Sequence, residues 1–149
     1  MLPMKALRLK LGVLLAADVP TLAPVAANKV ALVNAAFAPN EALTIASLSF
    51  ATFTGSAPIA GAAGPQGVGT DPATGDQVIT ILAPAGGWRY VCTVAPGAPE
   101  TIFGYALTDN AGAVLLGVQL LDVPVTIHNV NDEVDLGSVP ITFVVQPMA

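Results

Sequence analysis

The segment that decides the fold of this chain reads T-I-F-G-Y-A-L-T over residues 101–108, D-N-A-G over 109–112 and A-V-L-L-G-V-Q-L-L over 113–121. Two mostly apolar stretches of strand length flank four turn-forming residues, and the glycine at 112 ends a connection of a common hairpin length. The segment therefore predicts a β-hairpin with strands at 101–108 and 113–121.

Short apolar segments of the same kind recur on both sides of this hairpin. Thirteen prolines and fourteen glycines separate them, and no stretch has a sustained helical period. Further strands are expected within 5–17 and at 29–37, 48–54, 77–82, 88–94, 124–128, 134–136 and 141–145. One helical turn is expected at 41–46, with Asn40 as its N-cap.

This pattern predicts an all-β chain. The expected architecture is a single antiparallel β-sandwich or jelly-roll-like domain over residues 1–149, without internal repeats. A barrel would show the same alternation of residues, so the sequence does not separate the two.

Composition suggests that part of the surface is hidden in an assembly. Hydrophobic residues make up 54% of the sequence and charged residues 10%, whereas a soluble domain has about 25% charged residues. The mean hydropathy is +0.71, but no apolar stretch approaches the roughly 18 residues that a membrane-spanning helix needs. We therefore expect a homo-oligomer and no membrane partner.

The charges are few and segregated along the chain. A net charge of −5 leaves no basic face for nucleic acid. The segregated groups are Lys5, Arg8, Lys10 and Lys29 in the first fifth of the chain and Asp122, Asp132, Glu133 and Asp135 in the last fifth. Two interpretations are open: separate solvated surfaces, or complementary surfaces that meet within one chain or between neighbouring copies.

The basic start of the chain imitates a secretion signal, because its charges precede the apolar run at 11–17. Those charges alternate with leucines, however, and a cut after Ala17 would place Leu15 where a small residue is required. We interpret this segment as the first strand.

The chain has few residues that could perform catalysis. The single histidine, His128, and the single cysteine, Cys92, cannot form a four-ligand zinc site, and one cysteine cannot form a disulfide within the chain. Cys92 lies in an apolar run and is expected to be a buried, inert thiol, whereas His128 is expected to be exposed at a strand end. Acids near 71–76 and 131–135 match no calcium loop and suit turns equally. We expect no cofactor and no enzymatic activity; a small hydrolase with His128 as its base is the weakest hypothesis.

Two further features bear on partners. Trp88 and Tyr90 share one face of the expected strand 88–94, and Trp88 fits either the core, which we favour, or an exposed rim. An exposed Trp88–Tyr90 patch would suit a carbohydrate. The uncharged loop at 55–69, rich in Ala, Gly and Pro, is expected to be buried at a contact between subunits.

The second half of the chain carries a combination of short motifs. They are T-I-F-G-Y-A-L-T-D at 101–109, Gly112, Leu115-Leu116, Pro124-Val125 and Asp132, preceded by Leu48, A-T-F-T-G at 51–55 and P-A-G-G-W-R at 84–89. Together they resemble a pattern of small virion-associated proteins of tailed bacteriophages, over residues 43–145. In that group an acidic residue usually follows the L-L strand, where this chain has Gly117-Val118-Gln119. The resemblance implies a β protein of the head or tail without a known active site, so no site residue is carried over.

The first hypothesis is therefore a non-enzymatic virion structural protein, capsid-decorating or tail-associated. Its expected partners are further copies of itself and other virion proteins. The alternative is a receptor- or carbohydrate-binding adhesion module. The residues expected on the interaction surface are Lys5, Arg8, Lys10, Trp88, Tyr90, Asp132, Glu133 and Asp135.

Overall fold

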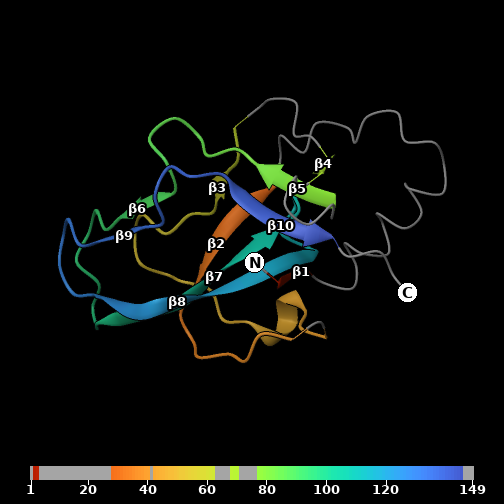
Figure 1. Ribbon diagram of the computed structural model, residues 1–149. Coiled ribbons are helices and arrows are strands. Elements are labelled where there is room, and N and C mark those ends of the chain that lie inside the picture. Colours follow the sequence, from red (N-terminus) through yellow and green to blue (C-terminus); the bar gives the residue numbers. More distant parts are fainter. Residues whose placement is uncertain (1, 4–27, 41, 63–67, 71–76, 146–149) are drawn as a thin grey trace.

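A computed structural model of the chain describes residues 2–3, 28–40, 42–62, 68–70 and 77–145 (Figure 1). Within these ranges the chain is mostly antiparallel strands with one short 3-10 helix, so the all-β prediction is confirmed. The strands are β1 (Leu2–Pro3), β2 (Lys29–Val33), β3 (Ile59–Ala60), β4 (Val68–Thr70), β5 (Gln77–Ile81), β6 (Arg89–Val91), β7 (Glu100–Thr108), β8 (Leu115–Ile127), β9 (Glu133–Asp135) and β10 (Ile141–Val145).

The predicted hairpin forms the centre of the largest sheet. β7 and β8 pair antiparallel through the Asp109–Gly112 turn, and the five-stranded sheet has the order β1-β8-β7-β2-β3. The Asp109 side chain accepts hydrogen bonds from the N–H groups of Ala113 and Val114 at 2.7 and 3.0 Å, which closes the turn. The two apolar stretches and the four turn residues between them were therefore enough to predict the hairpin.

β8 is longer than predicted because it joins the strands expected at 113–121 and 124–128. Ile102 pairs with Val125 and Gly104 with Leu120, so Phe103 alone lies opposite the four residues 121–124. These residues form a large bulge in β8. Pro124 is tolerated there because a bulge removes a residue from the hydrogen-bonded ladder.

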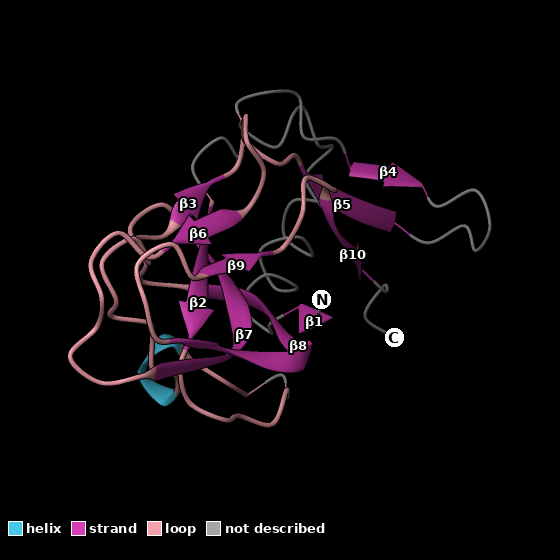
Figure 2. Ribbon diagram, turned by 90° about the vertical axis from the view of Figure 1, so that its left-hand side faces the viewer, coloured by secondary structure: helices cyan, strands magenta, loops and turns pink. Residues whose placement is uncertain are grey.

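Two smaller sheets complete the fold. One has the order β10-β5-β4 and the other pairs β6 with β9. Figures 1 and 2 show β6 and β9 apart from the group of β4, β5 and β10. The strands expected at 134–136 and 141–145 are therefore present, but they belong to different sheets.

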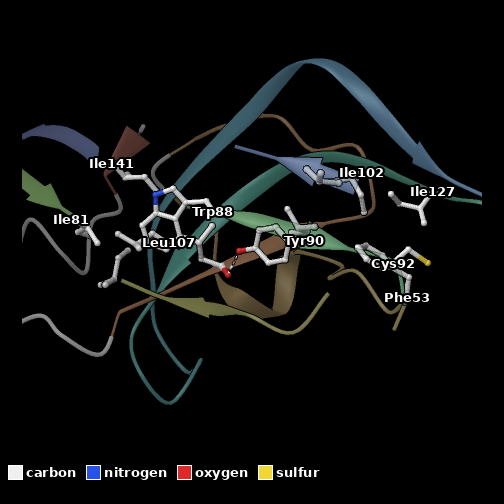
Figure 3. Packing of buried hydrophobic residues seen from close by; sticks show 13 residues of the cluster. Phe53, Ile81, Trp88, Tyr90, Cys92, Ile102, Leu107, Ile127 and Ile141 are labelled. Carbon is white, nitrogen blue, oxygen red and sulfur yellow. Dashed lines mark hydrogen bonds between the residues drawn. The ribbon is translucent and has the colours of Figure 1, made fainter. Parts of the chain in front are cut away.

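The main core lies where the three sheets meet. Its residues come from the five-stranded sheet, from both smaller sheets and from the connections between them (Figure 3). The core residues are Val30, Leu32, Phe53, Ile81, Trp88, Tyr90, Cys92, Ile102, Leu107, Leu116, Ile127, Val134 and Ile141. Burying each of the large side chains among them contributes about 1.5–3 kcal/mol to folding.

The other face of the five-stranded sheet is also covered. Val33 and Ala106 alternate with residues of the main core and join Leu115 and Val118 in a second buried cluster. Phe37, Leu43, Ile45, Leu48 and Phe50 pack against it from the connection between β2 and β3. Burial on both faces explains why β2 has four consecutive buried residues rather than an alternating pattern.

Several predicted elements in this connection were wrong. β2 ends at Val33 instead of residue 37, and the strand expected at 48–54 is reduced to two isolated bridges, Phe50 with Val33 and Thr54 with Val94. The reason is that the Glu100 carboxylate accepts the backbone N–H groups of Thr52 and Phe53, which a strand would offer to a neighbour.

The predicted helical turn is displaced along the chain. A 3-10 turn, η1, covers Ile45–Ser47 with Thr44 as its N-cap. Ser47 Oγ accepts the Thr44 N–H at 2.8 Å, whereas Asn40 Oδ1 accepts the N–H of Ala42 in a separate turn. Asn40 is therefore a turn residue and not the N-cap.

The loop expected at 55–69 contributes strands to two sheets. Ile59–Ala60 pairs with β2, and Val68–Thr70 pairs with β5. Gly61 is buried within the monomer itself. The described residues of this segment, 55–62 and 68–69, are thus part of the fold, and burial of the segment at a subunit contact stays a prediction.

Candidate functional site

The residues expected on an interaction surface are found in three different settings. Lys5, Arg8 and Lys10 lie outside the described residues, as does the strand expected within 5–17. Trp88 and Tyr90 are each 0% exposed, so their expected place on that surface is wrong. The core position favoured for Trp88 is confirmed.

The burial of these two aromatic residues has a clear cause. The Tyr90 hydroxyl donates a 2.6 Å hydrogen bond to the backbone carbonyl of Val30, which fixes the ring inside the core (Figure 3). Desolvation raises the pKa of Tyr90 far above its ordinary value. Trp88 Nε1 is buried without a hydrogen-bond partner in the described part of the chain. Neither ring offers a face to a carbohydrate.

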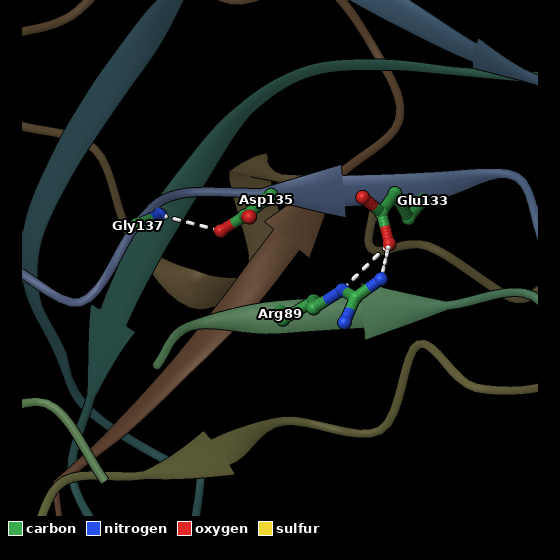
Figure 4. Close-up of polar contacts among 4 residues, drawn as sticks. All are labelled: Arg89, Glu133, Asp135 and Gly137. Atoms are coloured by element: carbon green, nitrogen blue, oxygen red, sulfur yellow. Dashed lines mark hydrogen bonds and ion pairs between the residues drawn. The ribbon is translucent and has the colours of Figure 1, made fainter. Parts of the chain in front are cut away.

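Asp132, Glu133 and Asp135 lie together at the β6–β9 end of the molecule. Glu133 accepts a 2.6 Å hydrogen bond from Arg89 Nε across the strand pair, and Asp135 accepts the Gly137 N–H at 2.7 Å (Figure 4). The Arg89–Glu133 pair is solvent-exposed and contributes at most about 1 kcal/mol. The two acids therefore serve β9 and the turn that follows it.

Asp132 holds the turn that leads into β9. Its Oδ2 accepts the backbone N–H groups of His128 and Asn129 at 2.7 and 2.8 Å. These two hydrogen bonds hold the pKa of Asp132 below its ordinary value. Asn131, in the same turn, has a φ of 71°, which an asparagine tolerates better than most residues.

His128 and Cys92 do not form a catalytic pair. His128 is exposed at the end of β8, as predicted, and its backbone rather than its ring binds Asp132. Cys92 is 0% exposed, and its thiol donates to the Val94 carbonyl at 3.1 Å. The predicted buried thiol is confirmed. No three His, Cys, Asp or Glu residues within the described ranges are grouped so that they could hold a metal ion.

The polar centre that the sequence did not reveal is Glu100, the first residue of β7. Its Oε1 accepts hydrogen bonds from Asn34 Nδ2 at 2.6 Å, the Thr52 N–H at 2.8 Å and the Thr52 hydroxyl at 3.3 Å. Its Oε2 accepts the Phe53 N–H at 2.8 Å. We call this arrangement the Glu100 clamp, because it ties two distant segments to the start of β7.

The electrostatics of the clamp favour an ionised carboxylate. Partial burial acts to raise the pKa of Glu100, but the hydrogen bonds from Asn34, Thr52 and Phe53 outweigh burial and hold the pKa below its ordinary value. Asn34 must direct its NH₂ group toward the carboxylate, since two acceptors would repel. Its Oδ1 is consequently buried without a partner among the described residues.

A hollow of about 500 Å³ opens beside the clamp. Its walls are residues 52–54 on one side and 94–99 on the other, with Glu100 as the charged group. The sequence V-A-P-G-A-P at 94–99 supplies small and ring-shaped side chains, which leave room between the two segments. This volume lies in the range of small-ligand sites. We call it the Glu100 pocket.

Comparison of the chain with protein-family models, with curated proteins and with solved structures finds no match. None of the helices that the structure describes is long and apolar enough to cross a membrane.

Proposed function

We propose that this chain is a non-enzymatic structural protein of a bacteriophage virion, either capsid-decorating or tail-associated. It acts through contacts with further copies of itself and with other virion proteins. The resemblance of residues 43–145 to virion-associated proteins of tailed bacteriophages supports a place in the virion. One observation supports the structural role. The polar side chains of the described residues mostly form hydrogen bonds within the fold, whereas several large apolar side chains are exposed and available for contacts with other proteins.

The polar half of this observation comes from the carboxylates. Glu100, Asp109, Asp132 and Asp135 each accept backbone N–H groups. Glu133 pairs with Arg89. General acid–base catalysis needs two titratable groups that converge on a substrate. Carboxylates engaged in this way favour a structural protein over a hydrolase that uses His128.

The apolar half comes from large side chains at the surface. Val123 is 73% exposed and Val139 is 72% exposed. Four others are also exposed, namely Leu82, Val94, Leu120 and Val130. Scattered apolar residues are normal on a monomer. Here they occur on a chain with only 10% charged residues, which favours burial against other proteins.

The proposal extends to the architecture. We assign the five-stranded sheet to one layer of a β-sandwich and the two smaller sheets to the other. The shared core of the three sheets supports this assignment. The alternative of a carbohydrate-binding adhesion module loses its aromatic platform, because Trp88 and Tyr90 are buried.

Native mass in solution tests the proposal. Light scattering at increasing protein concentration is expected to give a homo-oligomer of fixed size. Val123→Lys adds a charge to an exposed apolar position of the bulge and is expected to weaken the oligomer, because burying an unpaired charge is costly. Ala111→Lys is the control, since Ala111 is an exposed small residue of the hairpin turn. A monomer at every concentration would overturn the proposal.

A further inference from the structure

The Glu100 pocket has the composition of a site for a cation with an aliphatic stem. Thr52, Phe53, Thr54 and residues 94–99 contribute no charge to its walls, so the Glu100 carboxylate is its single charged group. Neither of the bases in the described ranges, Lys29 or Arg89, forms an ion pair with Glu100. Among the described residues, the negative charge of the pocket is thus balanced by hydrogen bonds alone.

The carboxylate retains room for one more donor. A carboxylate offers about four acceptor sites, two on each oxygen. Among the described donors, the Asn34 amide and the Thr52 N–H occupy both sites of Oε1, with the Thr52 hydroxyl at a longer 3.3 Å, whereas Oε2 accepts the Phe53 N–H alone. The free acceptor site is therefore on Oε2.

This asymmetry discriminates between cations. A guanidinium binds a carboxylate best through two parallel hydrogen bonds, one to each oxygen, and the crowded Oε1 opposes that geometry. Calcium requires six to eight oxygen ligands, far more than one carboxylate supplies. A primary ammonium is a compact charge that can donate a single strong hydrogen bond to Oε2.

We infer that the Glu100 pocket binds a primary ammonium group on an aliphatic chain, which in an assembly is a lysine side chain of a neighbouring protein. The ammonium donates to Glu100 Oε2, and the methylene stem packs along Val94 and Pro96. Only the source of the lysine rests on the proposed structural function. The pocket itself is a property of the single chain.

Amide chemical shifts measured by NMR test this assignment on the full chain. Titration with n-butylammonium is expected to shift the amides of Thr52, Phe53 and residues 94–98 and to reach saturation. n-Butylguanidinium and n-butanol, which have the same stem, are expected to bind at least about tenfold more weakly. Equal responses to the three probes, or no response to n-butylammonium, would overturn the assignment.

Two lysine variants test whether the binding depends on the pocket itself rather than on the general effect of an added surface charge. Val94→Lys places a cation on the pocket wall and is expected to reduce n-butylammonium affinity by about tenfold, since like charges repel at the contact. Ala111→Lys adds the same charge to an exposed residue outside the pocket lining and should leave the affinity unchanged. Equal effects of the two variants would contradict the site. A lack of n-butylammonium binding would leave the native mass in solution unchanged. The two experiments therefore distinguish failure of the pocket assignment from failure of the proposed function.

Discussion

At the scale of single residues, most acids in the described part of the chain hold backbone groups of turns and strands in place. Asp132 and Asp109 follow a sequence rule, because each accepts N–H groups a few residues further along or just before it in a turn. Their structural role could be predicted from the sequence. Glu100 could not be assigned in this way, since its partners Asn34 and Thr52 lie 66 and 48 residues away.

The Glu100 clamp predicts a specific loss of stability in acid. Because the folded-state pKa of Glu100 lies below its unfolded value, the clamp stabilises the fold fully above the unfolded pKa. This contribution is lost as the pH falls through the folded-state pKa. Urea unfolding of wild type and Glu100→Gln at several pH values is expected to show a difference at neutral pH that disappears in acid.

The size of that difference follows from the hydrogen bonds. A glutamine retains only one acceptor oxygen, so at least one donor among Asn34, Thr52 and Phe53 loses its partner, at about 1–3 kcal/mol. Asp122→Asn is the matched control, because Asp122 is exposed and accepts no hydrogen bond from the described residues. A Glu100→Gln midpoint equal to that of Asp122→Asn at neutral pH would refute the clamp.

At the scale of elements, the pairing of β7 with β8 depends on the absence of a side chain at Gly104. A Cβ at this position would lie 2.4 Å from the Gln119 carbonyl oxygen and 2.9 Å from the Phe37 ring. Gly104→Ala is therefore expected to destabilise the fold by more than about 2 kcal/mol, because the backbone of β8 would have to shift. Thermal unfolding provides the measurement.

Gly97→Ala is the control for this prediction. Gly97 lies in the exposed connection before β7, and a Cβ there would meet no atom within 4 Å. Its effect should be within about 0.5 kcal/mol of wild type. Similar melting temperatures for the two variants would contradict the close approach of β7 and β8.

The elements also show where local patterns fail. Strands at 77–81, 100–108 and 141–145 were predicted nearly to their ends. The first and the last pair with each other without interruption, and 100–108 pairs with β8 on both sides of the bulge. Residues 48–54 alternate like a strand but donate two of their N–H groups to Glu100. Alternation indicates which side chains are buried; it does not identify the acceptor of each backbone N–H.

At the scale of the whole molecule, the all-β class followed from the spacing of prolines and glycines. The division into three sheets did not, because it depends on pairings between distant segments, such as β5 with β10 and β6 with β9. That both faces of the five-stranded sheet are covered could not be predicted from the sequence either. It depends on apolar residues of the β2–β3 connection, whose place in space no local period fixes.

The candidate site also has parts that could be predicted from the sequence and parts that could not. The buried Cys92 and the exposed His128 were predicted from their neighbours in sequence. The Glu100 pocket was not, because its two walls, 52–54 and 94–99, are brought together by the bridge between Thr54 and Val94 and by the Glu100 clamp, which join residues far apart in the sequence. Glu100 directly follows the loop 94–99 in the sequence, but no local pattern shows that residues 52–54 lie opposite it.

We propose that this protein acts through exposed apolar contacts between copies. Amide hydrogen exchange at low and high protein concentration tests it most directly, because burial at an interface slows exchange. We expect slower exchange at high concentration at residues 120–123, around the exposed Leu120 and Val123, with the main core unchanged. Identical exchange throughout the chain at both concentrations would contradict the claim.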